Sequence, residues 1–95
     1  MSRYTLRQIA DILGLDPGFL EELAREEILT PDVPDADYSD RMLERARVCH
    51  ELVHELDVNL AGASVIVRLR EELVVLHQRV RVLALEVERT RTRSE

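Results

Sequence analysis

The chain has 95 residues, of which 45% are hydrophobic and 34% charged, and its net charge is -6. A chain this small buries proportionally little surface, so an interface with a further helix would add to its stability. Its longest charge-free run, residues 58–67, is well short of the roughly 20 residues that cross a membrane. We therefore expect no membrane segment. No basic-then-apolar signal pattern opens the sequence, and the single cysteine, Cys49, suits a reducing compartment, so we expect a cytoplasmic protein.

Charge is distributed unevenly along the chain. Residues 1–47 hold six Arg against eleven Asp and Glu, whereas residues 68–95 hold seven Arg against five Glu. An acidic N-terminal half repels the phosphate backbone of DNA and attracts a basic protein partner. Aromatic content is only 3%, and the apolar residues follow helical spacing, which predicts an all-α fold.

Two short helices open the predicted fold. Thr5 and Gln8 form a capping box before the first helix, and Gly14 is suited to end it. Asp16 is placed to cap a second helix that begins at Pro17. Two helices joined by a three-residue turn are the outline of a helix-turn-helix. The residues expected to face inward are Leu6, Ile9, Ala10, Leu13, Leu20, Leu23, Ala24 and Ile28.

The next segment, residues 30–38, is rich in Pro and Asp and is predicted to be a short acidic wing, either a loop or a small ribbon. Ser39 is expected to cap a third helix, and Asn59 a long last one. The third helix carries one apolar stripe, made of Met42, Ala46, Cys49, Val53 and Leu56. These signals divide the chain into a helix-turn-helix module over residues 1–58 and a coiled-coil helix over residues 59–95.

The last helix contains a heptad seam whose apolar residues alternate in steps of three and four. The seam, which we predict to be the interface of a homodimer, consists of Ile66, Leu69, Leu73, Leu76, Val80, Leu83 and Val87. Its flanking charges leave open whether the two helices run parallel or antiparallel. Beside the seam, Val67, Val74 and Val75 are expected to pack on the chain's own module. The basic end, with Arg89, Arg91 and Arg93, is predicted to be a frayed, solvated tail.

Residues 50–54 read His-Glu-Leu-Val-His, the H-E-x-x-H pattern that places two imidazoles on one helix face, as in zinc proteases. No third ligand follows at the metzincin spacing, because Asp57 and Leu60 occupy the expected Gly and His positions. A glycine-rich phosphate loop and a nucleophile with a matched base are absent as well. Zinc hydrolysis therefore remains the third alternative, and we expect a protein that is not an enzyme and uses no metal or cofactor.

The segment from Tyr4 to Leu29, the Tyr38-Ser39-Asp40 helix start and residues 57–63 together resemble the MerR superfamily, including the heat-shock repressor HspR. This resemblance covers nearly the whole chain. It implies a winged helix-turn-helix followed by an antiparallel coiled coil, with the second helix and the wing gripping DNA through an Arg-Tyr pair and an Arg-Arg-Tyr-Ser run.

This chain departs from that pattern at the residues that contact phosphate. Glu21 and Glu22 occupy the positions of the helix pair, and Ala36 and Asp37 those of the two wing arginines. Of the DNA-contacting set only Arg25 and Tyr38 are kept. Carboxylates in place of cations remove counterion release and add repulsion, so we expect DNA binding to be lost.

The branch of the superfamily that shows this loss is that of the CbpM chaperone modulators, which this chain resembles in length, acidity and coiled-coil end. The resemblance implies a protein that binds the J-domain of a DnaJ-like co-chaperone such as CbpA and blocks its access to DnaK. J-domains present a basic helix, which an acidic surface could bind. The expected partner-binding residues are Glu21, Glu22, Arg25 and Glu26. Acidic residues of the third helix, Glu44, Glu51 and Glu55, form a rival surface, and an HspR-like DNA-binding regulator is the alternative function.

Overall fold

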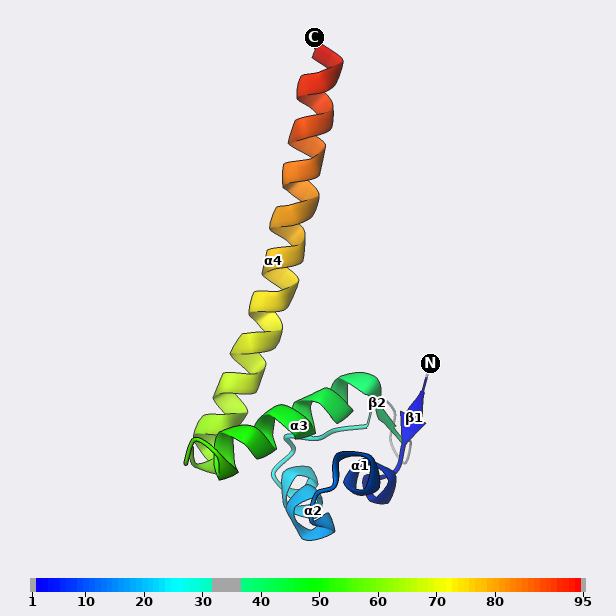
Figure 1. Ribbon diagram of the computed structural model, residues 1–95, viewed down its shortest axis with the longest axis vertical. Helices are drawn as coiled ribbons and strands as arrows, with labels where there is room; N and C mark the ends of the chain where they lie inside the picture. The colour runs from blue at the N-terminus through cyan, green and yellow to red at the C-terminus, as the bar shows by residue number, and fades with distance from the viewer. Residues whose placement is uncertain (1, 32–36, 95) are drawn as a thin grey trace. The chain divides into compact units, whose positions relative to one another are not determined.

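The computed structural model describes residues 2–31 and 37–94 of the chain. Within them the helices are α1 (Leu6–Leu13), α2 (Pro17–Arg25), α3 (Asp40–His54) and α4 (Leu60–Ser94) (Figure 1). Two strands of two residues each, β1 (Arg3–Tyr4) and β2 (Tyr38–Ser39), form a small antiparallel sheet. The predicted all-α class with a long last helix is confirmed.

The chain divides into two compact units, residues 1–64 and residues 65–95. The first holds the sheet, the three shorter helices and the first turn of α4, whereas the second is the rest of α4. The module predicted over residues 1–58 therefore continues through Ser64, because the first turn of α4 belongs to the same compact unit. No described helix is long and apolar enough to span a membrane.

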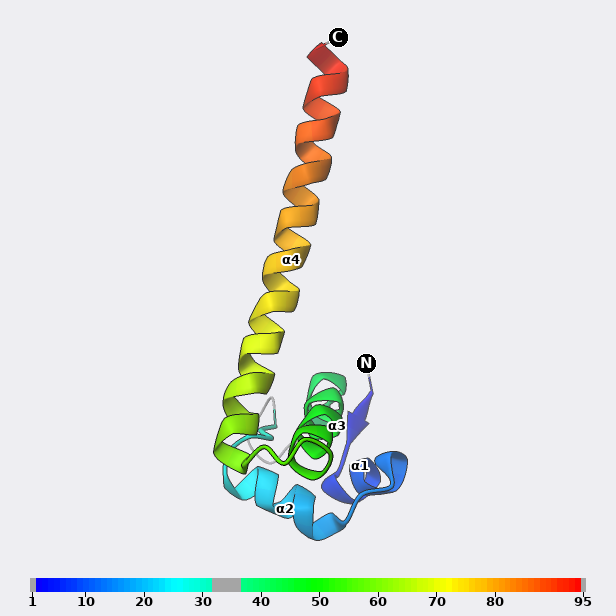
Figure 2. The ribbon, with the colours of Figure 1, turned by 60° about the vertical axis from the view of Figure 1, so that its left-hand side comes forward.

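Local signals set the turn between α1 and α2 (Figure 2). Both bonds of the capping box are formed, from the Gln8 amide to Thr5 Oγ1 at 3.1 Å and from the Thr5 amide to Gln8 Oε1 at 2.9 Å. Gly14 ends α1 with φ of 67°, in the left-handed region that glycine adopts without a steric cost. Asp16 Oδ1 then accepts the Gly18 amide at 2.9 Å and opens α2. The predicted helix-turn-helix outline is thus realised by the expected caps.

The end of α2 differs from the prediction. The helix stops at Arg25, so Ile28 lies beyond it and not within it. The Ile28 amide donates to the Leu23 carbonyl at 2.9 Å and the Glu27 amide to the Ala24 carbonyl at 3.1 Å. These two bonds form a Schellman motif, which requires a left-handed residue, here Glu27 with φ of 58°. The reversal turns Ile28 and Leu29 into the core, where they are 2% and 1% exposed.

The sheet joins the N-terminus to the start of α3. Arg3 lies opposite Ser39 and Tyr4 opposite Tyr38, and the Tyr4 hydroxyl donates to Asp40 Oδ1 at 2.6 Å. Ser39 occupies the N-cap position of α3, but its side chain makes no capping hydrogen bond. The predicted Ser39 cap is therefore correct in position and wrong in mechanism, because the strand pairing fixes the extended backbone there.

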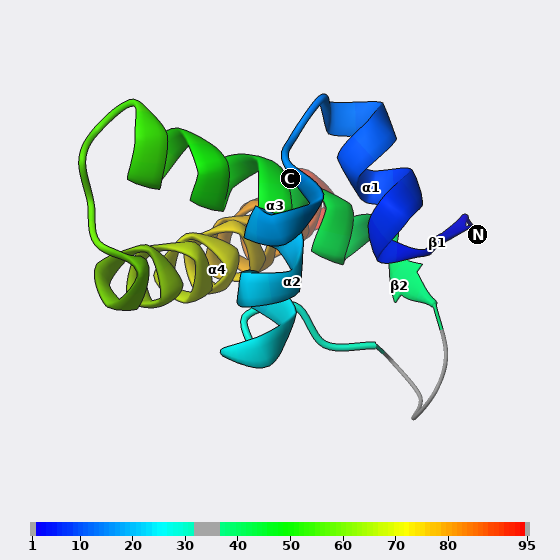
Figure 3. The same cartoon turned by 90° about the horizontal axis from the view of Figure 1, so that it is seen from below.

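The core of the first unit lies between α1, α2 and α3 (Figure 3). Arg45 is only 7% exposed and donates from Nη1 to the Ile28 carbonyl at 2.8 Å, which satisfies a carbonyl just beyond α2. The apolar residues buried in the described chain are Ile9, Ala10, Leu20, Leu23, Ile28, Leu29, Met42, Ala46, Val48, Cys49, Ala63 and Val67.

The last elements bring three corrections. Leu56, predicted on the apolar stripe of α3, lies beyond the end of that helix at His54 and is 67% exposed. Val67 is buried as expected, but Val74 and Val75 are 48% and 49% exposed. The basic tail is solvent-exposed as predicted, but it is helical, because α4 continues through it to Ser94 and the Thr90 and Thr92 hydroxyls donate back to the carbonyls of Glu86 and Glu88. Asn59 does cap α4, since its Oδ1 accepts the Gly62 amide at 2.7 Å.

Candidate protein-binding site

The outward face of α2 carries the four predicted partner-binding residues. Glu21, Glu22, Arg25 and Glu26 are all exposed, whereas Leu20 and Leu23 of the same helix are fully buried. Burial of the two leucines fixes the rotation of α2 about its axis, so the charged residues of the opposite face point to solvent. The basic residue at this face, Arg25, stands in the last turn of α2, where a cation compensates the negative end of the helix dipole.

The carboxylates of this face are not neutralised within the part of the chain that the structure describes. No hydrogen bond or ion pair there involves the side chains of Glu21, Glu22 or Glu26. Two of them, Glu22 and Glu26, border an open hollow of the first unit. Its remaining lining consists of Ile28, Leu60, Ala61 and Ser64. A long basic side chain fits such a hollow, because its aliphatic stem covers apolar surface while its charge meets carboxylates.

Two of the three carboxylates of the rival acidic surface, Glu44 and Glu51, pair with a cation of α3, whereas Glu55 lies at the C-cap beyond the helix and is exposed. Arg47 donates to Glu44 at 2.6 Å and to Glu51 at 2.5 Å, with all three side chains less than half exposed. The hydrogen bonds that Arg47 donates to Glu44, and then the charge of both carboxylates, raise the pKa of Arg47 above its ordinary value. A partner cation would have to displace Arg47 here, which makes α2 the more accessible acidic face.

The wing prediction falls largely on residues outside those described. Ala36 and most of the loop predicted over residues 30–38 lie there, whereas Asp37 is exposed and Tyr38 belongs to β2. Among the described residues near this point, β2 pairs with β1.

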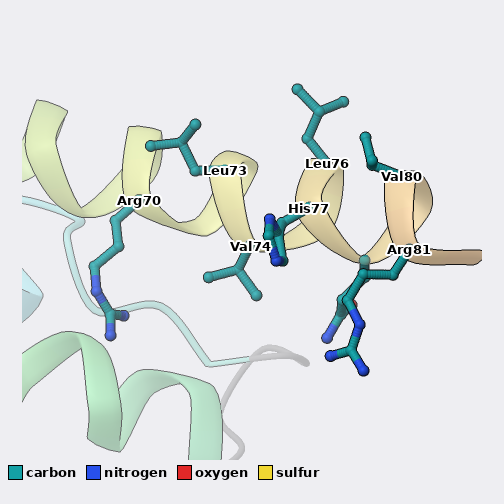
Figure 4. Close-up of a pocket in the computed structure, with 8 residues that line it drawn as sticks. Arg70, Leu73, Val74, Leu76, His77, Val80 and Arg81 are labelled. Atoms are coloured by element: carbon teal, nitrogen blue, oxygen red, sulfur yellow. The ribbon is translucent and has the colours of Figure 1, made fainter. Parts of the chain in front are cut away.

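The heptad seam forms the second candidate surface, on α4. Every seam residue is exposed in the isolated chain, from 39% at Ile66 to 65% at Leu73. Leu73, Leu76 and Val80 project to one side of the helix, and Arg70, Val74 and Arg81 to the other (Figure 4). An uninterrupted apolar row on an exposed stretch of helix is the kind of surface through which proteins commonly associate.

The His-Glu-Leu-Val-His segment lies on α3 as the sequence predicted. The two imidazoles stack with ring centroids 4.3 Å apart, and the Phe19 ring of α2 packs edgewise against both, at 5.6 Å from His50 and 5.0 Å from His54. Glu51, which would be the general base of a zinc protease, accepts a hydrogen bond from Arg47. In the described residues no group of three or more His, Cys, Asp or Glu side chains could hold a metal ion.

Sequence reasoning missed two features of these surfaces. Leu60, Ala61 and Ser64 of α4 line the hollow beside Glu22 and Glu26, and no local pattern connects residues so far apart in the chain. Phe19 was likewise not placed against the histidines, because the contact between α2 and α3 is tertiary. The sequence offers only a weak indication of this contact: Phe19 is the one phenylalanine of the chain, and aromatic side chains commonly pack against another ring.

The two short helices with their capped turn, the small sheet and the long last helix define a helix-turn-helix protein. The chain matches the family model described as MerR HTH family regulatory protein over residues 4–84 and belongs to that family. Comparison with curated proteins and with solved structures gave no match.

Proposed function

We propose that this protein is a dimeric chaperone modulator of the CbpM type, which binds and inhibits the J-domain of a DnaJ- or CbpA-like co-chaperone. The acidic face of α2 is the proposed contact surface, and the partner supplies the cations of its basic helix. No chemistry and no cofactor are needed, because inhibition follows from occupying the surface that the co-chaperone presents to its Hsp70.

The observation that carries the proposal is the charge of the second helix of the helix-turn-helix. In a DNA reader this helix contacts phosphates and bases, but here Glu21, Glu22 and Glu26 are exposed and make no ion pair in the described chain. Such a surface repels phosphate and steers a cationic protein toward it. A homodimer through α4 would present the face twice, which increases avidity for a partner with two J-domains.

The test is to measure binding of the full chain to a purified J-domain by isothermal titration calorimetry. The double substitution Glu21→Arg and Glu22→Arg reverses the charge at two positions of the α2 face and leaves the core unchanged. We expect the affinity for the J-domain to fall at least about tenfold, because two attractive charge pairs are replaced by repulsions. The control is Glu51→Arg on α3 with Glu55→Arg at its C-cap, which changes the net charge equally. An equal loss in the control, or unchanged binding in the α2 variant, would exclude this face.

The alternative function is a DNA-binding regulator, which the description of the matching family favours. Its signature would be a sequence-specific, salt-sensitive shift of promoter fragments from the source genome at physiological ionic strength. Such a shift, abolished by Arg25→Ala, would replace the proposed function with this one. We expect no shift, because the acidic first unit opposes phosphate contact.

A further inference from the structure

Two histidines on α3 form a pair that the proposed function does not use. His50 and His54 are one helical turn apart, and their rings lie nearly parallel, with 26° between planes and 4.3 Å between centroids. Residues four apart share one helix face, so both imidazoles can reach a common point in solvent. His54 is exposed and His50 half-buried, which leaves the pair open on one side.

The surroundings hold the two rings in place. Phe19 of α2 packs edgewise against both imidazoles, with interplanar angles of 81° and 73°. The Nδ1 atom of His54 lies 3.3 Å from the backbone carbonyl oxygen of His50. In the tautomer with a proton on Nδ1, this nitrogen donates to the carbonyl and Nε2 keeps its lone pair. A ring nitrogen that donates to a backbone carbonyl is the usual support of a histidine that coordinates a metal through the other nitrogen.

The local electrostatics also favour a cation. His54 is the last residue of α3, where the helix dipole has its negative end. The nearest cation along the helix, Arg47, is engaged by Glu44 and Glu51. A metal ion held by the two imidazoles at this helix end would therefore not meet a free positive charge from Arg47.

From this geometry we propose that His50 and His54 bind a divalent first-row transition metal ion through two imidazole nitrogens, with water in the remaining positions. Imidazole ligands select Cu²⁺, Ni²⁺ and Zn²⁺ over Mg²⁺ and Ca²⁺, and the order of affinity places Cu²⁺ above Ni²⁺ and Zn²⁺. The site binds without catalysing hydrolysis, since Glu51 is held by Arg47. Because both ligands come from adjacent turns of α3, the ion bridges the last turn of the helix and stabilises the folded state.

The experiment titrates the full-length protein with NiCl₂ and with CuCl₂, following heat by calorimetry and the His Cε1–H signals by NMR. We expect one ion per chain, tighter binding of Cu²⁺ than of Ni²⁺, and broadening of the His50 and His54 signals before that of His77. His54→Asn should weaken the affinity at least about tenfold, since even outer-shell changes cost about 10- to 100-fold. His77→Asn on α4 is the matched control and should bind as the parent does.

The melting temperature gives a second readout that does not depend on heat of binding. Saturating Ni²⁺ should raise the melting temperature of the parent and of His77→Asn, and leave that of His54→Asn unchanged. The variant with both His50→Asn and His54→Asn serves to define background binding. An affinity of the parent no higher than this background, or an equal loss in His77→Asn, would overturn the proposal.

Discussion

The guanidinium of Arg45 donates from Nη1 to the backbone carbonyl of Ile28 at 2.8 Å, in a buried position. This bond connects α3 to the chain reversal that follows α2. Among the described residues, Arg45 is the one charged or polar residue that is buried. A backbone carbonyl just beyond the end of a helix needs a hydrogen-bond donor when it is shielded from water. The contact therefore holds the end of the proposed binding helix against the rest of the first unit.

Replacement of Arg45 by Met should remove this bond while keeping an unbranched side chain in place of the aliphatic stem of arginine. The free energy of unfolding is expected to fall by about 2 kcal/mol, the range for a hydrogen bond from a charged donor to a buried acceptor. Urea denaturation at one fixed protein concentration measures it. Arg41→Met, at an exposed position of the same helix, is the control, and equal losses in the two variants would contradict the role assigned to Arg45.

Glycine at position 27 should stabilise the protein. Glu27 has φ of 58°, a left-handed conformation that costs an L-residue roughly 1–2 kcal/mol and glycine nothing. Glycine also increases the conformational entropy of the unfolded chain, which offsets part of this gain. We therefore expect Glu27→Gly to raise the free energy of unfolding by about 0.5 kcal/mol. The comparison variant is Glu26→Gly, where φ is -84° and the same change should destabilise. The prediction fails if Glu27→Gly destabilises as much as Glu26→Gly.

The seam on α4 should govern the oligomeric state. Leu76 is in the middle of the seam and 56% exposed in the single chain, so Leu76→Glu should place a charge in the interface of each subunit. Loss of a buried leucine costs about 1.5–3 kcal/mol per chain, which is enough to shift a micromolar dimer to monomers. Sedimentation equilibrium of the parent, Leu76→Glu and Gln78→Glu distinguishes the seam from a general charge effect. A monomeric parent at tens of micromolar concentration would refute the dimer.

The hydrogen bond between Tyr4 and Asp40 should make stability depend on pH in the alkaline range. Asp40 Oδ1 accepts a hydrogen bond from the Tyr4 hydroxyl, and this bond is the main cause that raises the pKa of Tyr4 above its ordinary value. Because the folded state favours the protonated phenol, its contribution is complete below pH 10 and is lost as the pH rises through the raised pKa. Tyr4→Phe should therefore lower the melting temperature at pH 8, and the difference from the parent should disappear at strongly alkaline pH. A difference that persists there would argue against this origin.

The starts of the helices and the turn of the helix-turn-helix could be predicted because the sequence signals for them are local. The capping box of Thr5 and Gln8, Gly14 at the end of α1, and the caps at Asp16 and Asn59 all act within a few residues. The acidic face followed from the same periodicity, since burial of Leu20 and Leu23 leaves Glu21 and Glu22 exposed. A stable helical period thus determines which residues face outward before any partner element is known.

The tertiary structure decided what depends on contacts between distant segments. Pairing of Arg3–Tyr4 with Tyr38–Ser39, burial of Arg45 against Ile28, and the packing of Phe19 on the two histidines each join residues more than ten positions apart. The sequence by itself determined the helices, the turn and the seam, since backbone hydrogen bonds and side-chain periodicity are local. Only the folded chain determined where helix α2 ends and what its end contacts, because that balance depends on burying Ile28 and Leu29 in a core assembled from other helices.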